Sequence, residues 1–336
     1  MRAGGGPLRT LVARLDSDGD VLLAGPAVRA AAAAGEVTLL VGPAGRQAAG
    51  LLPGVDDVLV WACPWVANPA PAVDAADVDR LVGAVRERRP DVALVLTSFH
   101  QSPLPLALLL RLAGVPRIVA RSIDYPGSLL DVRLTDDIDV PEAERALAVA
   151  RAAGFELPPG DSGGLAVLPQ PPTTPGPYVV VHPGASVPAR TWSPDRWAEA
   201  VSVLTGRGHR VLVTGGPGER ALTARVAGTA GVDLGGRTTL AELAGLLAGA
   251  DALVVGNTGP AHLAAAVGTP VVSLFAPVVP AARWAPHGPH VLLGDQSAPC
   301  RDTRARDCPV PGHPCLDGVD PRRVADAVDE LIGVRA

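Results

Sequence analysis

Residues 252–274 read ALVVGNTGPAHLAAAVGTPVVSL, and the fold class can be inferred from their pattern. A short apolar run ends at a glycine, a polar loop follows, and an alanine-rich segment then leads to a second apolar run. Pro260 stands where the first turn of a helix tolerates proline. The stretch therefore predicts a strand, a loop, a helix and another strand, which is the βαβ unit of a parallel sheet.

The same alternation runs through the whole chain. Strands are predicted in the first half at residues 10–15, 37–41, 55–61, 91–97 and 117–120, and in the second half at residues 178–182, 209–214, 232–234, 252–256 and 271–274. Helical stretches follow most of these runs. We therefore expect an α/β protein of the doubly wound type, with two Rossmann-like domains that face a central cleft.

The position of the domain boundary follows from length and composition. A chain of 336 residues exceeds what one hydrophobic core usually supports. Residues 157–177 are dense in proline and glycine and lack periodicity, as in an exposed connector. We place the boundary near Gln170, which gives an N-terminal domain over 1–170 and a C-terminal domain over 171–336.

Charge and composition exclude several classes of protein. The net charge of −5 argues against nucleic-acid binding, which usually needs a basic surface. No apolar run approaches the roughly 20 residues that cross a bilayer, and charges interrupt the first apolar stretch, unlike a secretory signal. Four cysteines in a chain of this length do not make a disulfide scaffold. We expect a cytoplasmic protein.

Candidate functional residues lie in the loops after the strands, because open parallel sheets bind ligands at the carboxyl ends of their strands. After the first predicted strand the chain reads DSDGDVLL, with a helix expected to begin near Asp20. In one interpretation Asp18 or Asp20 caps that helix. In the other, Asp20 accepts the proton of an acceptor hydroxyl that attacks an anomeric carbon.

The loop after residue 182 reads HPGASVPARTW and resembles an anion-binding loop before a helix. Backbone amides near Gly184, the Ser186 hydroxyl and the Arg190 guanidinium suit a diphosphate. The alternative is an ordinary turn with a surface arginine. His182 closes a predicted buried strand, and we interpret it as structural.

Two further loops offer candidates for a nucleotide site. In GGPGE, residues 215–219, Gly216 allows close approach to a ribose or phosphate and Glu219 is a candidate partner for ribose hydroxyls; a plain helix-start turn is the alternative.

In NTGPAH, residues 257–262, Thr258 and Gly259 are expected at a helix N-terminus, whose free amides hold phosphate oxygens. His262, one turn into that helix, either reaches the donor or packs in the core.

The segment CRDTRARDCPVPGHPC, residues 300–315, brings three cysteines and His313 together in sequence. It contains no C-x2-C pair, so its spacing matches no standard zinc pattern. We expect reduced thiols that pack an irregular loop rather than a metal site.

Taken together, these motifs resemble those of bacterial glycosyltransferase family 9, whose best-known members are the ADP-heptose:lipopolysaccharide heptosyltransferases. The resemblance spans nearly the whole chain and rests on the stretches GDVLLAGPAVRA, HPGASVPARTW, VTGGPGE, LGGRTTLAELAGLLAGADALVVGNTGPAHLAAAVGTP and HPCL. It implies a GT-B fold, an acceptor bound mainly by the N-terminal domain and a nucleotide-sugar donor bound by the C-terminal one. It also implies inversion at the anomeric carbon, with ADP-heptose as donor, a glycan or glycolipid hydroxyl as acceptor, and no metal or other cofactor.

Carried over by position, the resemblance makes Asp20 the catalytic base and gives donor contacts to Ser186, Arg190, Thr258, Gly259 and His262. The chain departs from the family pattern at Ala185, where a second threonine is common, and at Arg190, where lysine is common. Asn257 is a further predicted residue of the donor site, and it replaces a frequent aspartate, which bears on the preferred sugar.

Two other functions remain open at this point. A nucleotide-sugar epimerase of related architecture would need no acceptor, and a non-catalytic nucleotide-sugar binder would release no nucleotide. We expect a monomer. The scattered arginines Arg111, Arg117 and Arg121 either face solvent or contact the anionic inner surface of the membrane.

Overall fold

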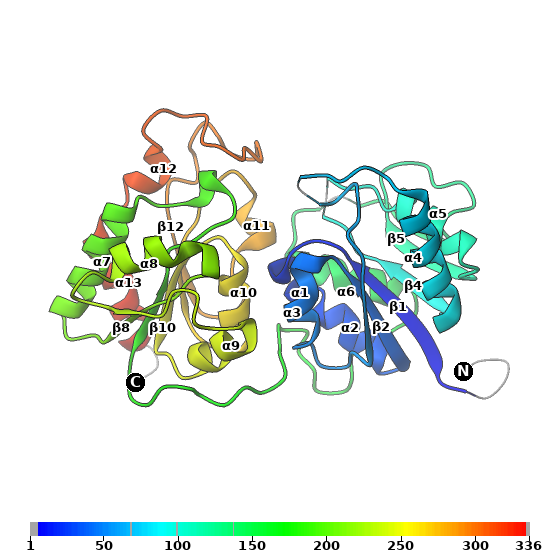
Figure 1. Ribbon diagram of the computed structural model, residues 1–336, viewed down its shortest axis with the longest axis horizontal. Helices are drawn as coiled ribbons and strands as arrows, with labels where there is room; N and C mark the ends of the chain where they lie inside the picture. The colour runs from blue at the N-terminus through cyan, green and yellow to red at the C-terminus, as the bar shows by residue number, and fades with distance from the viewer. Residues whose placement is uncertain (1–5, 68, 99, 137, 334–336) are drawn as a thin grey trace. The chain divides into compact units, whose positions relative to one another are not determined.

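The computed structural model describes residues 6–67, 69–98, 100–136 and 138–333. It divides into two compact units, unit 1 (Met1–Leu168) and unit 2 (Pro169–Ala336). Each unit has its own parallel sheet with helices on both faces, as Figure 1 shows. The expectation of two doubly wound α/β domains is confirmed, and the division falls close to Gln170.

The sheet of unit 1 has six parallel strands in the order β3-β2-β1-β4-β5-β6. This is the strand order of a Rossmann sheet, and it reverses direction between β1 and β4. The strands are β1 (Leu8–Arg14), β2 (Gly35–Val41), β3 (Asp57–Val60), β4 (Val92–Val95), β5 (Arg117–Arg121) and β6 (Val132–Leu134).

Two helices, α4 (Ala75–Arg88) and α5 (Leu104–Leu112), cover one face of the unit 1 sheet, and the remaining helices lie on the other side (Figure 1). Apolar side chains such as Leu81, Leu106 and Leu110 pack with strand residues in a buried core on the α4–α5 side. The other helical segments are α1 (Asp18–Leu23), α2 (Gly25–Ala32), η1 (Pro43–Gly45), α3 (Arg46–Ala49) and α6 (Glu142–Ala152).

The sheet of unit 2 repeats this topology, with the order β12-β11-β10-β7-β8-β9. Counted from its own first strand, this is again the Rossmann order, and it reverses between β7 and β10. The strands are β7 (Val179–His182), β8 (Val211–Val213), β9 (Val232–Asp233), β10 (Ala252–Gly256), β11 (Val271–Leu274) and β12 (His290–Leu293).

The core of unit 2 is built around two buried tryptophans, Trp192 and Trp197, whose rings meet edge to face. Helices α7 (Pro194–Gly206), α8 (Arg220–Ala227) and α13 (Pro321–Gly333) cover this side, and α9 (Leu240–Ala248) and α10 (Gly259–Ala266) cover the other. The short segments are η2 (Pro188–Arg190), η3 (Pro217–Glu219), α11 (Ala281–Trp284) and α12 (Pro314–Asp317).

The ten predicted strands are all present, and each sheet has one more strand than expected. These additional strands, β6 and β12, lie at sheet edges and pair with a single neighbour. β6 is three half-buried residues with an arginine at its centre, and β12 follows a stretch rich in proline and glycine. Neither has the apolar run by which a central, fully buried strand is recognised.

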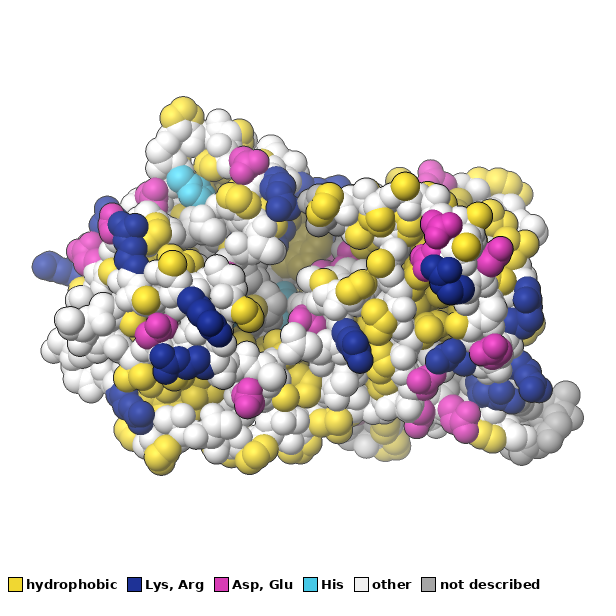
Figure 2. All heavy atoms as spheres, viewed as in Figure 1, with side chains coloured by type: hydrophobic (Ala, Val, Ile, Leu, Met, Phe, Trp, Pro, Cys, Tyr) yellow, Lys and Arg dark blue, Asp and Glu magenta, His cyan; other side chains and the backbone are white. Residues whose placement is uncertain are grey.

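Among the described residues, no helix combines the length and the apolar character that crossing a membrane requires. On the face that Figure 2 displays, basic and acidic side chains are interspersed over each unit. That pattern differs from the single basic stripe typical of nucleic-acid-binding surfaces.

Candidate functional site

Most candidate residues of each unit follow the strands between which the order of its sheet reverses, whereas Gly216 and Glu219 follow β8, the neighbour of β7. In unit 1 the loops after β1 and β4 carry Asp20 and Gln101. In unit 2 the loops after β7 and β10 carry Arg190 and Thr258. Such topological switch points open a crevice between neighbouring loops, which is where open α/β sheets bind their ligands.

Asp20 lies in the first turn of α1, which begins at Asp18 rather than near Asp20. Its two carboxylate oxygens accept separate hydrogen bonds, at 2.9 Å from Arg14 Nη2 and at 2.9 Å from Ser17 Oγ. The side chain is 23% exposed, so a ligand can still reach it. The carboxylate is therefore held in one orientation without being sealed off.

Arg14 ends strand β1 and is a residue of the candidate site that the sequence motifs did not indicate. Its guanidinium also donates to Ser98 Oγ at 3.0 Å, pairs with Asp16 at 3.0 Å and lies 3.9 Å from Glu142. Burial opposes the charge, yet the carboxylates of Asp16, Asp20 and Glu142 together hold the pKa of Arg14 above its ordinary value. The buried Arg14 thus holds two aspartates, and Glu142 nearby also pairs with Arg145 at 3.2 Å.

The other two aspartates of this loop have structural partners. Asp16 accepts a 2.6 Å hydrogen bond from the Gln101 amide, and burial raises the pKa of its carboxyl group. Asp18 accepts from the backbone amide of Ala48 in α3, and burial raises its pKa as well. The cap position is Ser17 and the Asp18 carboxylate bonds to another helix, so the capping interpretation is wrong for Asp18.

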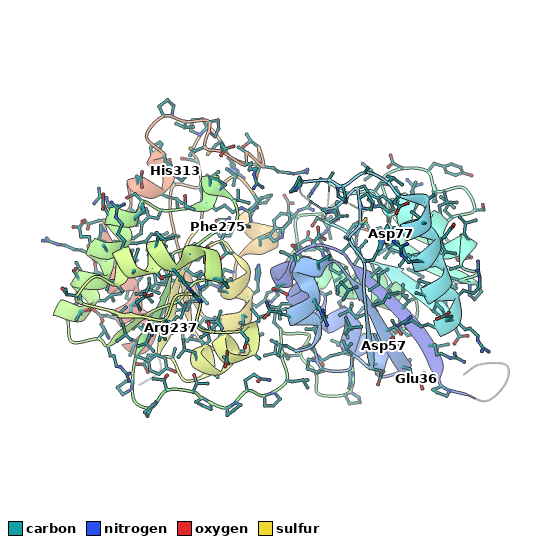
Figure 3. The ribbon with its side chains drawn as sticks, in the orientation of Figure 1. Glu36, Asp57, Asp77, Arg237, Phe275 and His313 are labelled. Carbon is teal, nitrogen blue, oxygen red and sulfur yellow. The ribbon has the colours of Figure 1, made fainter. Side chains whose placement is uncertain are left out.

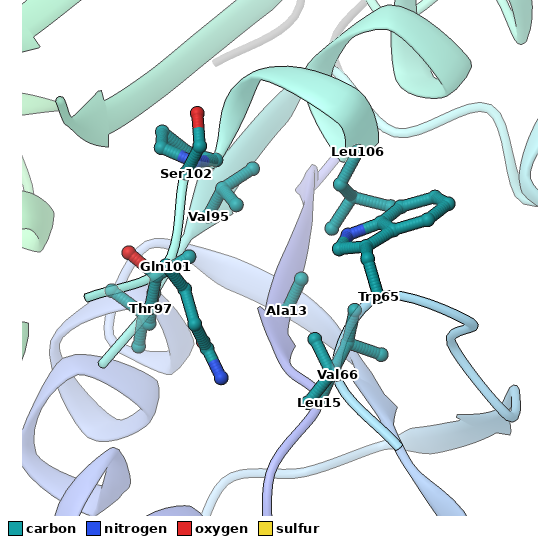
Figure 4. Close-up of a pocket in the computed structure, with 11 residues that line it drawn as sticks. Ala13, Leu15, Trp65, Val66, Val95, Thr97, Gln101, Ser102 and Leu106 are labelled. Atoms are coloured by element: carbon teal, nitrogen blue, oxygen red, sulfur yellow. The ribbon is translucent and has the colours of Figure 1, made fainter. Parts of the chain in front are cut away.

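Besides a hollow of about 270 Å³ that Arg14, Glu142 and Arg145 themselves line, two further hollows adjoin this charged cluster in unit 1. The larger has about 570 Å³ of unfilled space open to solvent and is lined by residues that include Ser98, Gln101, Arg121 and Arg145. The smaller, about 290 Å³, has an apolar wall that includes Trp65 and lies beside β1 and β4 (Figure 4). Ser98 and Gln101, which bond to Arg14 and Asp16, border the larger hollow.

In unit 2, His182 has the structural role that the sequence indicates. Its Nδ1 lies 3.0 Å from Thr214 Oγ1, and burial lowers the pKa of the imidazole. The Glu219 carboxylate occupies the space in which a side chain at position 184 would stand, so any residue other than glycine there would require Glu219 to move. Glu219 also accepts a 2.6 Å hydrogen bond from the Gly216 amide, which ties its own turn together. Donor contacts by Gly216 and Glu219 stay predictions.

Arg190 closes the short η2 segment and contacts the loop after β10. Its Nη1 donates to the Asn257 carbonyl at 3.4 Å. A Cβ at Gly256 would come within 3.0 Å of the Arg190 carbonyl oxygen, so this glycine permits the close approach. Two segments 67 residues apart in sequence therefore meet at the switch point. Ser186 lies in the same loop and is exposed.

The loop before α10 carries one polar side chain that is hydrogen-bonded and one whose hydroxyl has no hydrogen-bond partner among the described residues. The Asn257 amide donates to the Ala276 carbonyl at 3.3 Å and accepts from the Ala276 amide at 3.4 Å. Thr258 and Gly259 stand at the N-terminus of α10, as expected. Within the part of the chain that the structure describes, the buried Thr258 Oγ1 has no hydrogen-bond partner. An unsatisfied buried hydroxyl costs free energy, which a bound ligand would relieve. His262 is buried one turn further on.

The cysteines are all reduced. Cys300 and Cys315 are buried in the core of unit 2, and burial followed by the nearby Cys300 and Cys308 thiols raises the pKa of Cys315 to about 12. Across the described residues, no group of three or more His, Cys, Asp or Glu side chains is arranged to hold a metal ion.

A comparison with protein families places this geometry in a known context. The model of "Glycosyltransferase family 9 (heptosyltransferase)" matches residues 80–312, which is well over half of the chain.

Individual relatives agree with this match. Lipopolysaccharide heptosyltransferase 3 of Escherichia coli is 31% identical over 165 residues, 46% of this chain and 47% of the relative. The chain thus matches about half the length of such curated relatives.

The solved structure of Escherichia coli ADP-heptose lps heptosyltransferase II has a TM-score of 0.74 and 21% identity, covering 98% of this chain and 99% of that one. A glycosyl transferase family 9 structure from Veillonella parvula has a TM-score of 0.77 and 17% identity, covering 98% of both chains. These structural likenesses establish the fold, which is the two-unit GT-B arrangement.

Proposed function

This chain belongs to glycosyltransferase family 9, and on that premise we propose that it transfers a sugar from a nucleotide donor to an acceptor hydroxyl. The observation that carries the proposal is the contact of Arg190 with the Asn257 carbonyl, next to the N-terminus of α10. A guanidinium and a helix terminus side by side form a site for a diphosphate. The α10 terminus also presents the unpartnered Thr258 hydroxyl.

In the proposed reaction the acceptor hydroxyl attacks the anomeric carbon from the face opposite the leaving group, which inverts the configuration. Asp20 accepts the hydroxyl proton, while the bond from the anomeric carbon to the nucleoside diphosphate breaks. Arg14 and Ser17 hold the carboxylate of Asp20 by one hydrogen bond to each oxygen. The Asp20 side chain stays 23% exposed, which leaves the carboxylate accessible to the acceptor.

The departing diphosphate gains negative charge as the sugar bond breaks. Arg190 and the amides at the α10 terminus are preorganised to stabilise this charge, so that the reaction needs no metal ion. Ser186, Gly216 and Glu219 complete the proposed donor site, with Glu219 available to ribose hydroxyls once its bond to the Gly216 amide is exchanged. His262 lies one turn inside the same helix.

We propose ADP-heptose as donor and a lipopolysaccharide inner core as acceptor. The support is the family of the chain and the names of its relatives, which include lipopolysaccharide heptosyltransferases. The hollow bordered by Ser98 and Gln101 is the proposed acceptor pocket, because both residues bond to the cluster that holds Asp20. The proposed location is the cytoplasm, at the inner face of the membrane that carries such acceptors.

The test is acceptor-dependent release of ADP. Purified protein is incubated with ADP-heptose, with and without lipopolysaccharide that lacks heptose, and ADP and the mass of the glycan are measured. Release of ADP only with acceptor, together with a glycan heavier by one heptose, supports the proposal. Epimerised donor in the absence of acceptor would identify an epimerase instead, and binding without release of ADP would identify a non-catalytic binder.

A further inference from the structure

The segment from residue 295 to 317, which holds three of the four cysteines, forms a closed loop on unit 2; we name it the cysteine segment. The Asp295 amide donates to the Cys315 carbonyl at 2.9 Å and closes the loop at its base. Within it, the amides of Asp302 and Arg304 donate to the carbonyls of Pro277 and Val278. The cysteine segment is therefore tied to the chain that follows β11.

The cysteine segment also hydrogen-bonds to Ala189, the residue directly before Arg190, through both the backbone amide and the backbone carbonyl of Ala189. The Ala189 amide donates to the Arg306 carbonyl at 2.9 Å. The Ala189 carbonyl lies 3.1 Å from His313 Nε2. Because a carbonyl can only accept, Nε2 must carry the hydrogen of this bond. A third contact, from the Ser193 amide to Asp317 Oδ1 at 3.3 Å, follows Arg190 on its other side.

Two observations indicate that His313 is fitted to this contact. His313 has a left-handed backbone, with φ of 46° and ψ of 49°, a conformation that disfavours side chains with a Cβ. It is labelled in Figure 3 and directly precedes α12, which ends the cysteine segment. Directly after it, Cys315 and Leu316 are buried in the core of unit 2 and anchor the segment. The strained backbone thus presents the imidazole to the η2 turn from a fixed base.

We propose that His313 is the positioning residue for Arg190, and that the cysteine segment serves to hold the η2 turn in the conformation that presents its guanidinium to the donor diphosphate. This inference rests on the proposed function, since it assigns the diphosphate to Arg190. It extends that function by a residue 123 positions away in sequence, which the comparisons do not assign. His313 itself touches backbone, so its effect passes through Arg190.

The experiment measures ADP binding by calorimetry together with donor KM and kcat for the full chain. His313→Ala is expected to weaken ADP binding and raise donor KM by roughly five- to tenfold, the loss typical of one hydrogen bond, with kcat changed less. His313→Gln, whose amide nitrogen can replace Nε2, should restore both values. His313→Asn, which is too short, should not. His290→Ala is the matched control, because His290 is exposed and lies in the same unit.

A double-mutant cycle separates this proposal from the proposed function. In an Arg190→Ala background, His313→Ala should cause no further loss, because the two residues act through one contact. If Arg190→Ala binds ADP normally, the role of Arg190 in the proposed function fails. If Arg190→Ala weakens binding but His313→Ala does not, or if the two losses add, the positioning role of His313 fails. If His313→Ala does not fold, the comparison of His313→Gln with His313→Asn tests the proposal instead. Equal ADP binding by these two variants would overturn it.

Discussion

The two switch points of this molecule are held together by different kinds of interaction. In unit 1 the candidate base is held by ionised side chains, with Arg14 bonded to Asp16 and Asp20 and close to Glu142. In unit 2 the loops are held mainly by backbone groups, as in the bonds of Asn257 to Ala276. A base needs one carboxylate in one orientation, whereas a diphosphate is bound by several amides and a cation. The difference therefore matches the two halves of a transfer reaction.

The sharpest way to break this comparison is to remove the carboxylate. Asp20→Asn keeps the shape of the side chain but cannot accept the proton, so kcat should fall by about 10²- to 10⁴-fold. Donor affinity should be unchanged, because the donor contacts are proposed in unit 2. Steady-state kinetics and ADP binding measure the two effects. Asp195→Asn is the matched control, an exposed aspartate in the first turn of α7. A normal rate for Asp20→Asn would remove it as the base.

The next effect concerns stability rather than rate. Arg14→Ala leaves Asp16 and Asp20 without their buried counter-charge, while Glu142 keeps Arg145, and the free energy of unfolding should fall by about 3–5 kcal/mol. Arg14→Lys should recover part of this loss, since one ammonium group cannot reproduce every contact of the guanidinium.

Urea unfolding measures the effect of Arg14→Ala, and Arg80→Ala is the control, because Arg80 pairs with Asp77 at the surface. A surface pair contributes about 0–1 kcal/mol, so the two variants should differ clearly. If they unfold at the same urea concentration, the charged network is not what holds the unit 1 site.

The smallest effect sharpens the unit 2 side of the comparison. Asn257→Asp restores the residue common in the family, but an ionised carboxylate cannot donate to the Ala276 carbonyl. The free energy of unfolding should fall by about 1–3 kcal/mol, the cost of a buried acceptor left unpaired. Thermal unfolding checks this, with Asp251→Asn, at the start of β10, as a charge control. An unchanged melting temperature would mean that the hydrogen bond from the Asn257 amide to the Ala276 carbonyl does not stabilise the fold.

Most strands could be predicted from the sequence because buried parallel strands are continuous apolar runs, as in β10 and β11. The strands β6 and β12 could not be predicted, because strands at sheet edges need less apolar surface. The loop motifs located Asp20, Arg190 and Thr258 at the switch points. An arginine at the end of an apolar strand, two residues before the first aspartate of DSDGD, was a signal for Arg14.

The partners of Arg14 could not be predicted in the same way. Ser98 is 84 residues from Arg14, and the bond between His313 and Ala189 spans 124 residues. Such contacts arise from the folded arrangement of loops that are remote in sequence, and no local pattern encodes them. The capping interpretation of Asp18 failed for the same reason, since its partner Ala48 belongs to another helix.

Separate sheets and separate apolar interiors have a thermodynamic consequence. Two such bodies in one polypeptide can melt as distinct cooperative blocks, so a single unfolding enthalpy does not describe the molecule. Tryptophan fluorescence would follow both blocks, through Trp61 and Trp65 in one and Trp192 and Trp197 in the other. In differential scanning calorimetry, a compound raises the transition of the block that binds it, so each substrate can be assigned to its half of the chain without mutation.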